Sequence, residues 1–148
     1  MRKFALSFMV GLMSVGVTGC NDDDDDRMDT KLIKGLWEVV SVDSPEYTSI
    51  YNFTTRSELT WSWGNLNIYY LSVSGQPVLD KEYSWHVSDP ANDETVYLDI
   101  VLKEGDEMVG NPVYYIVEKL TASDMILRET GESKPQIRFR RRNDLTLP

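Results

Sequence analysis

From Gly35 onward the chain is a series of short apolar or alternating runs separated by turn residues, with no long helical period. In the run 58–63, for example, Leu59, Trp61 and Trp63 alternate with polar residues, which is the period of a strand with one buried face. Such a series is typical of an antiparallel barrel or sandwich. We expect eight or nine short strands, at 35–42, 47–55, 58–63, 66–73, 79–88, 95–103, 113–120, 125–128 and 137–140.

Turn-forming residues separate these runs, and two runs have an imperfect pattern. Gly64-Asn65 is a hairpin-type pair, and 104–110 reads as a charged turn. Lys81 interrupts the alternation of the run that begins at Leu79. The run 113–120 is apolar on both parities, so its inner face stays ambiguous.

The first 20 residues have the composition of a bacterial export signal. Two basic residues at positions 2 and 3 precede an uncharged stretch that is shorter than the roughly 20 residues needed to cross a bilayer. The tetrad 17–20, Val-Thr-Gly-Cys, resembles the lipobox of bacterial lipoproteins. The resemblance implies that 1–19 is a cleaved signal peptide and that Cys20 carries lipid. The alternative is an ordinary secretory signal followed by a free cysteine.

Five consecutive aspartates, Asp22–Asp26, follow this cysteine. Adjacent carboxylates repel one another, so we expect 20–33 to be a disordered acidic tether before a folded domain at 34–143 and a tail at 144–148. An acidic run in this place also resembles the signal that directs some Gram-negative lipoproteins to the cell surface. We therefore expect a lipid-anchored protein of the outer membrane, at the cell surface, with the periplasmic face as the alternative.

Charge and motif content exclude several functions. Without the signal, 13 of the 15 basic residues remain against 24 acidic ones, so the net charge is about −11 and nucleic acid is not an expected partner. The only cysteine is the expected lipid site, so no disulfide is expected. His86 is the only histidine and reads as a solvated strand residue. No metal-ligand spacing, phosphate loop or nucleophile motif is present, so we expect no cofactor, no metal and no enzymatic activity.

Both ends of the expected domain carry a recognisable pattern. Gly35-Leu36-Trp37 opens the first strand, and Arg138, Arg140 and Arg141 lie on the last. This resembles the lipocalin and lipocalin-like families, in which a Gly-x-Trp strand plugs one end of an up-and-down barrel and an arginine from the last strand packs over the Trp. The resemblance implies a lipocalin-like barrel closed by Gly35, Trp37 and Arg140.

The second half of the chain adds to this resemblance. The segments 115–121, 124–127 and 138–140 together are similar to the closing pattern of small lipocalin-like lipoproteins of gut bacteria. An eight-stranded barrel can be filled by its own side chains or can hold one small molecule, and the sequence leaves both open.

Aromatic residues are the most informative candidates for a binding site. Trp61 and Trp63 share one face, as do Tyr83 and Trp85, and these four are the predicted ligand-binding residues. They could fill the core, line the mouth of a barrel, or form an exposed platform for sugar rings. We expect a monomer that binds a small apolar or amphipathic molecule in the barrel. The alternative is a non-enzymatic surface accessory protein that binds glycan or another protein.

Overall fold

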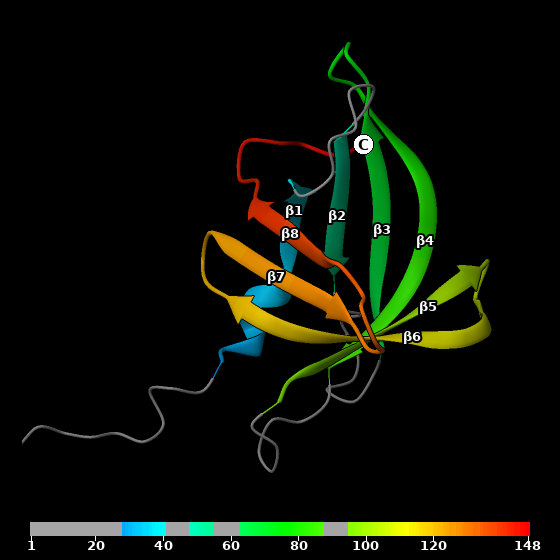
Figure 1. Cartoon of the computed structure of the whole chain (residues 1–148). Helices are drawn as coiled ribbons and strands as arrows, with labels where there is room; N and C mark the ends of the chain where they lie inside the picture. The colour runs from blue at the N-terminus through cyan, green and yellow to red at the C-terminus, as the bar shows by residue number, and fades with distance from the viewer. Residues whose placement is uncertain (1–27, 41–47, 55–62, 88–94) are drawn as a thin grey trace, which may run out of the picture.

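The computed structural model describes residues 28–40, 48–54, 63–87 and 95–148 (Figure 1). Each strand pairs antiparallel with the next and the first pairs with the last, so the sheet closes into an up-and-down barrel. This confirms the predicted fold class and is compatible with a lipocalin-like fold. No helix among the described residues is long and apolar enough to cross a membrane. The elements are η1 (Thr30–Ile33, a 3₁₀ helix), β1 (Gly35–Val39), β2 (Thr48–Thr54), β3 (Gly64–Leu71), β4 (Pro77–Val87), β5 (Tyr97–Glu104), β6 (Glu107–Leu120), β7 (Asp124–Glu129) and β8 (Gln136–Arg141).

Two predicted turns are wrong. Gly64 and Asn65 are not a hairpin turn but the first residues of β3, where Gly64 lies opposite Trp85. The charged turn is much shorter than 104–110, because Glu104 already pairs with Glu107 across a two-residue turn. Gly105 in that turn has φ +63°, a conformation that glycine adopts without steric cost, so a tight connection suffices.

The core fills the part of the barrel nearest η1. Alternate residues point inward along the strands, as the period-two patterns predict, except where bulges shift the register in the β3–β4, β5–β6 and β6–β7 pairs. Trp37, Leu98 and Met125 are fully buried there, and Phe53 meets Trp85 edge-on with ring centroids 5.5 Å apart. The buried members of this core are Ile33, Trp37, Phe53, Leu66, Trp85, Val96, Leu98, Ile100, Val117, Met125, Leu127 and Phe139.

One end of the barrel is closed by η1, Trp37 and Arg141. The indole Nε1 of Trp37 donates a hydrogen bond to Ile33 O at 2.7 Å. The Arg141 guanidinium lies over the Trp37 ring, 4.1 Å from its centroid, and donates to the carbonyls of Leu32, Lys34 and Ala122. These bonds satisfy backbone groups that the short helix leaves unpaired, so this end is sealed.

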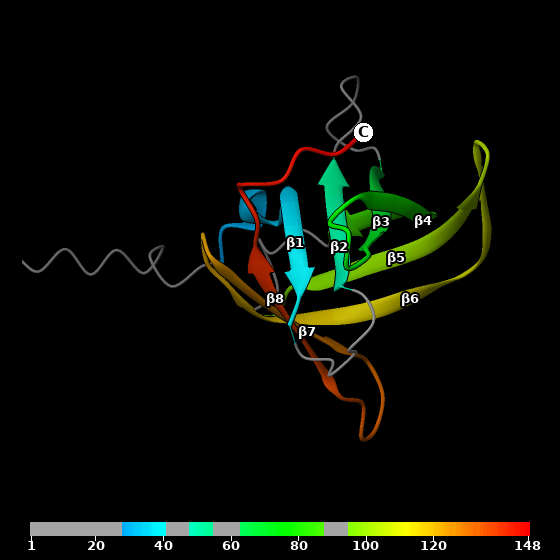
Figure 2. The same cartoon turned by 90° about the horizontal axis from the view of Figure 1, so that it is seen from above.

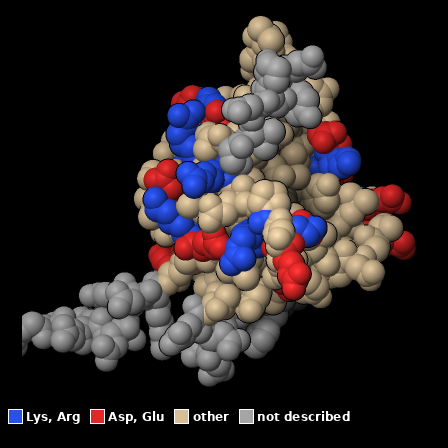
Figure 3. Space-filling view, in the orientation of Figure 1, with Lys and Arg blue, Asp and Glu red and all other residues tan. Residues whose placement is uncertain are grey.

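The arginine at this position is Arg141, so the choice of Arg140 as the closing residue is wrong. Trp37 pairs directly with Arg141 across β1 and β8, which puts both side chains on the inner face. Arg140 has the opposite parity and pairs with Glu38 on the outer surface, at 3.1 Å. Figure 3 shows basic and acidic residues interspersed on this side of the barrel. A shift of one residue in a strand reverses the face, and the resemblance alone did not set that register.

The other end of the barrel is partly open between β4 and β5. β4 pairs with β5 only over 83–87, so 77–82 has no partner on that side. Figures 1 and 2 show the β5–β6 hairpin bending away from β4 here. Inner-face residues along this opening are exposed: Val78 by 42 %, Val109 by 38 % and Val113 by 39 %. The open half therefore offers apolar wall that the core does not cover.

Candidate ligand-binding site

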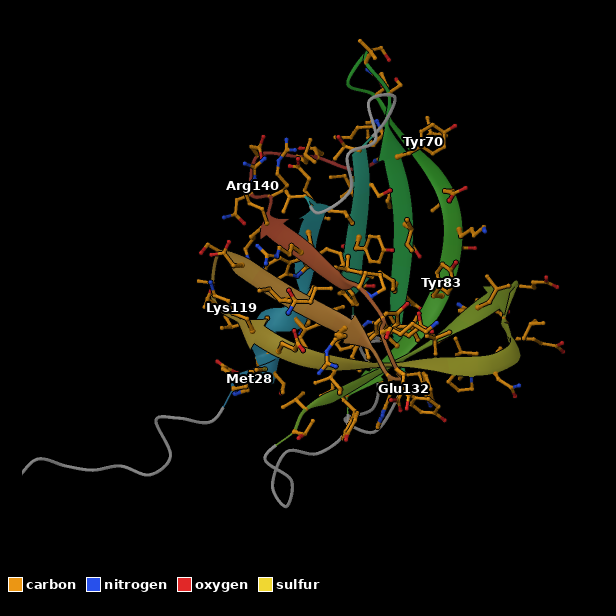
Figure 4. The ribbon with its side chains drawn as sticks, in the orientation of Figure 1. Met28, Tyr70, Tyr83, Lys119, Glu132 and Arg140 are labelled. Carbon is orange, nitrogen blue, oxygen red and sulfur yellow. The ribbon has the colours of Figure 1, made fainter. Side chains whose placement is uncertain are left out.

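Three tyrosines on the inner face lie between the packed core and the open half. Tyr51 on β2, Tyr83 on β4 and Tyr115 on β6 all pack against the core cluster and are half-buried. We call these three residues the tyrosine cluster. Tyr51 lies opposite Trp37 on one side and Ile68 on the other, which ties the cluster to the closed end and to the open half. Figure 4 labels Tyr83 on β4, on the side where β4 and the hairpin diverge.

The phenols of this cluster lie within electrostatic reach of one another. Burial, with added effects of Tyr115, Tyr83 and Asp80, raises the pKa of Tyr51 to about 12. Burial also raises the pKa of Tyr115, with added effects of Glu129 and Tyr83. Tyr51 and Tyr115 therefore stay protonated at neutral pH and present hydroxyl groups that can both donate and accept hydrogen bonds.

Next to Tyr51 the inner face forms a partly open hollow of about 240 Å³. Its lining residues are Ser49, Ile68, Tyr69, Tyr70 and Asp80. Ile68 alternates with the core residue Leu66, and Ser49 lies opposite Tyr70, so these three lining residues continue the inner face of β2 and β3. Tyr69 has the opposite parity and lies opposite Ile50. The volume is below the roughly 300–1,000 Å³ of a typical small-molecule pocket, which suits a small ligand or one part of a larger one.

A β-bulge places the one charged residue of this lining. Ile68 pairs with Lys81 and Tyr69 pairs with Leu79, so Asp80 has no residue opposite it. The extra residue shifts the parity along β4, so Lys81 keeps the register of the inner-face residue Ile68 while Leu79 lies opposite Tyr69 on the other face. Bulges re-aim side chains next to sites, and here the bulge puts a carboxylate among apolar and aromatic residues.

A second carboxylate lies on the inner face, on β7. Glu129 shares its face with the core residues Met125 and Leu127 and lies opposite Tyr115. Its Oε1 forms an ion pair with Lys134 Nζ, at a distance of 3.2 Å. Its charge is therefore compensated by a neighbouring lysine, unlike that of Asp80, for which the structure records no ion pair among the described residues.

The two predicted residues on β4 lie on one face but have different surroundings. Tyr83 belongs to the tyrosine cluster. Trp85 is 7 % exposed, and its indole Nε1 donates to Thr54 O at 2.9 Å and to Asn65 O at 3.1 Å. Trp85 is thus a core residue in the closed half, with its polar group satisfied. Neither residue is among the five that line the hollow.

Of the other predicted pair, Trp63 does not line the hollow. Trp63 precedes β3 and packs against His86, with ring centroids 5.4 Å apart. His86 lies on the outer face, where its Nδ1 is 3.7 Å from the Asp99 carboxylate. Trp61 lies outside the described residues, as does Cys20. The paired platform of Trp61 and Trp63 therefore stays a prediction.

Sequence reasoning missed most of the hollow. Tyr115 lies in a run that is apolar on both parities, so alternation did not show which face it occupies, and Tyr51 was not singled out in its run. Asp80 sits beside Lys81, and the break in alternation there was the one signal of the bulge. Among the described residues, no group of three or more His, Cys, Asp or Glu is placed to hold a metal ion.

Comparison with known proteins identifies no relative of this chain. Neither a protein-family model, a curated protein nor a solved structure matches this chain. The site is therefore interpreted from its own geometry: a barrel sealed at the Trp37 end, a tyrosine cluster at mid-height, and an apolar hollow with one carboxylate in the open half.

Proposed function

We propose that this protein is a lipid-anchored, lipocalin-like binding protein that takes a small amphipathic molecule into the open half of its barrel. The observation that carries the proposal is the hollow beside Ile68, at the end opposite the Trp37–Arg141 closure. Apolar wall, aromatic rings and a few polar groups are the usual composition of small-molecule sites. The proposal is for binding and not for catalysis.

The proposed location rests on the N-terminal pattern. Lipid on Cys20 and the acidic run Asp22–Asp26 favour an anchored protein at the cell surface of a Gram-negative bacterium. Two or three acyl chains hold a protein at a membrane, whereas one holds it only marginally. Cys20→Ser is expected to move the protein from the membrane fraction to the soluble fraction, and unchanged membrane association would refute the anchor.

The binding proposal is tested with the neutral fluorescent probe N-phenyl-1-naphthylamine. Its fluorescence is expected to rise on binding to the wild-type protein. Ser49→Trp adds a large side chain at the hollow and is expected to weaken probe binding at least tenfold. The matched control Val73→Trp adds the same side chain at a position that is 94 % exposed and is expected to bind like wild type.

Both variants are first checked for folding by circular dichroism and by their Tm. If Ser49→Trp does not fold, Ile68→Phe serves as the second blocking variant, because Ile68 lines the same hollow. Equal probe binding by a folded blocking variant and by wild type, or no probe binding by wild type, contradicts the proposal.

A further inference from the structure

We propose that the ligand of this hollow is an organic cation, an amine or quaternary ammonium on an apolar body, with Asp80 as its counter-ion. This inference rests on the proposed function, because it names the chemical class bound at the same site. The inference goes beyond the proposed function because it assigns the ligand a positive charge and names the residue that selects for that charge.

The first support is that Asp80, the one carboxylate of the lining, differs from those acids of the barrel that have a basic partner. Glu38, Glu118, Glu129 and Asp144 each pair with an arginine or lysine. For the Asp80 carboxylate, the described residues supply neither an ion pair nor a hydrogen bond. A cationic ligand group in the hollow would supply the missing partner.

The second support is the composition of the lining. The five lining residues include one acid and no base, and two of them are tyrosines. A carboxylate beside aromatic rings is the usual means by which proteins recognise ammonium groups, because the ring faces attract cations. Ile68 and the exposed inner wall at Val78 supply contacts for an apolar body.

The third support is the field around the opening. The hairpin tip that borders it carries Glu104, Asp106 and Glu107 against Lys103. Figure 3 shows acidic residues at the projecting right-hand edge of the molecule, where this hairpin lies. The protein as a whole has a net charge of −9. Such a field raises the local concentration of cations and disfavours anions.

Lys81 is the basic residue nearest to Asp80 in sequence. It lies opposite Ile68 in the register but is exposed and is not part of the lining. Asp80 also adds to the rise in the pKa of Tyr51, whereas no lysine is among the causes of that shift. Asp80 thus lies near enough to Tyr51 to affect its phenol, and the structure records no ion pair between Lys81 and Asp80, both of which are exposed.

The test compares two ligands that differ in charge and hardly in shape. Decyltrimethylammonium is the cation, and decyldimethylamine N-oxide is its near-isosteric neutral analogue at pH 8. Each is titrated below its micelle concentration, by displacement of N-phenyl-1-naphthylamine and by calorimetry. We expect the wild-type protein to bind the cation at least tenfold more tightly, a difference of about 1.4 kcal/mol.

Two variants test whether Asp80 causes the preference for the cation. Asp80→Asn is expected to abolish the preference, because it weakens cation binding about tenfold more than N-oxide binding. The matched control Asp106→Asn makes the same charge change at the hairpin tip, outside the lining, and is expected to keep the preference.

The outcomes separate this inference from the proposed function. If both ligands bind equally, the charge selection is wrong while the binding function stands. If neither ligand binds and the probe does not bind either, the proposed function fails. If Asp80→Asn weakens both ligands alike, or if Asp106→Asn abolishes the preference, Asp80 is not the counter-ion.

Discussion

The guanidinium of Arg141 lies 4.1 Å from the centroid of the Trp37 ring, directly opposite it across the β1–β8 pair that closes the barrel. This contact joins the first strand to the last and also fixes η1 through the carbonyls of Leu32 and Lys34. It seals one end of the barrel, so the proposed ligand would enter from the other end.

Arg141→Met is therefore expected to lower the free energy of unfolding by about 2–4 kcal/mol. The variant removes the cation–π contact and leaves three carbonyls without their donor. Arg140→Met is the matched control, because Arg140 makes an exposed ion pair worth at most about 1 kcal/mol. Urea unfolding measures both. A larger loss for Arg140→Met than for Arg141→Met would contradict the assignment of the closing residue.

Gly35→Ala tests the close approach that this closure requires. Gly35 has φ +126°, and an added Cβ would collide with the Arg141 guanidinium. Gly75→Ala is the control, since Gly75 also has a positive φ, +76°, but has open space around it. We expect Gly35→Ala to cost about 1–3 kcal/mol more than Gly75→Ala in urea unfolding. Equal losses would show that only the backbone conformation matters.

Gly64 and Trp85 are expected to be energetically coupled. A Cβ at Gly64 would lie 2.5 Å from Thr54 O and 2.6 Å from Cε2 of Trp85, so Gly64→Ala must displace the indole from its hydrogen bonds. The single variant is expected to cost about 2 kcal/mol. Trp85→Phe removes part of the obstacle, so the double variant is expected to lose less than the sum of the two single losses. If the two single losses of stability add up to the loss of the double variant, Gly64 and Trp85 are not energetically coupled.

Burial of Tyr51 predicts a loss of stability at high pH. The folded pKa of about 12 lies above the ordinary value of 10, so the unfolded chain loses this proton first as the pH rises. The raised pKa of Tyr51 therefore contributes on the order of 2–3 kcal/mol to the free energy of unfolding. This contribution is complete below pH 10 and is lost between about pH 10 and 12. Urea unfolding at a series of pH values measures it.

Tyr51→Phe is expected to reduce this alkaline loss, because the variant has no phenol at that position to ionise. Tyr114→Phe, which removes a phenol that is 48 % exposed, is the matched control and is expected to retain the loss. If Tyr51→Phe and wild type lose stability equally from pH 10 to 12, Tyr51 is not buried in the barrel as described.

How far the sequence predicts this molecule depends on whether a feature is local. Alternation along one strand is a local property, and it predicted the all-β class of the barrel. The place of Trp37 in the interior was implied by the resemblance and not by alternation. Register between strands is not local, because it depends on which residues lie opposite each other. The choice of Arg140 over Arg141 and the interpretation of Gly64 as a turn both failed for this reason.

The hollow was harder to predict than the fold. A bulge opposite Ile68 and Tyr69 leaves Asp80 without a partner in the register, where it lines the hollow, and a single strand shows such a bulge only as a break in its pattern. Of the predicted aromatic residues, Tyr83 packs in the tyrosine cluster because it shares the inner face near the opening. Trp85, two residues further along, lies in the filled half. The two residues differ in their position along the barrel axis. Alternation in the sequence predicts the face on which a residue lies but not that position.

The central claim is that ligand binds in the open half and not at the sealed end, and isoleucine methyl NMR tests it most directly. In a titration of the methyl-labelled protein with N-phenyl-1-naphthylamine, the Ile68 δ1 methyl signal is expected to shift because it lines the hollow. The Ile33 signal, fully buried behind Trp37, is expected to stay in place. An unchanged Ile68 signal at saturating probe, or a shift centred on Ile33, would contradict the account.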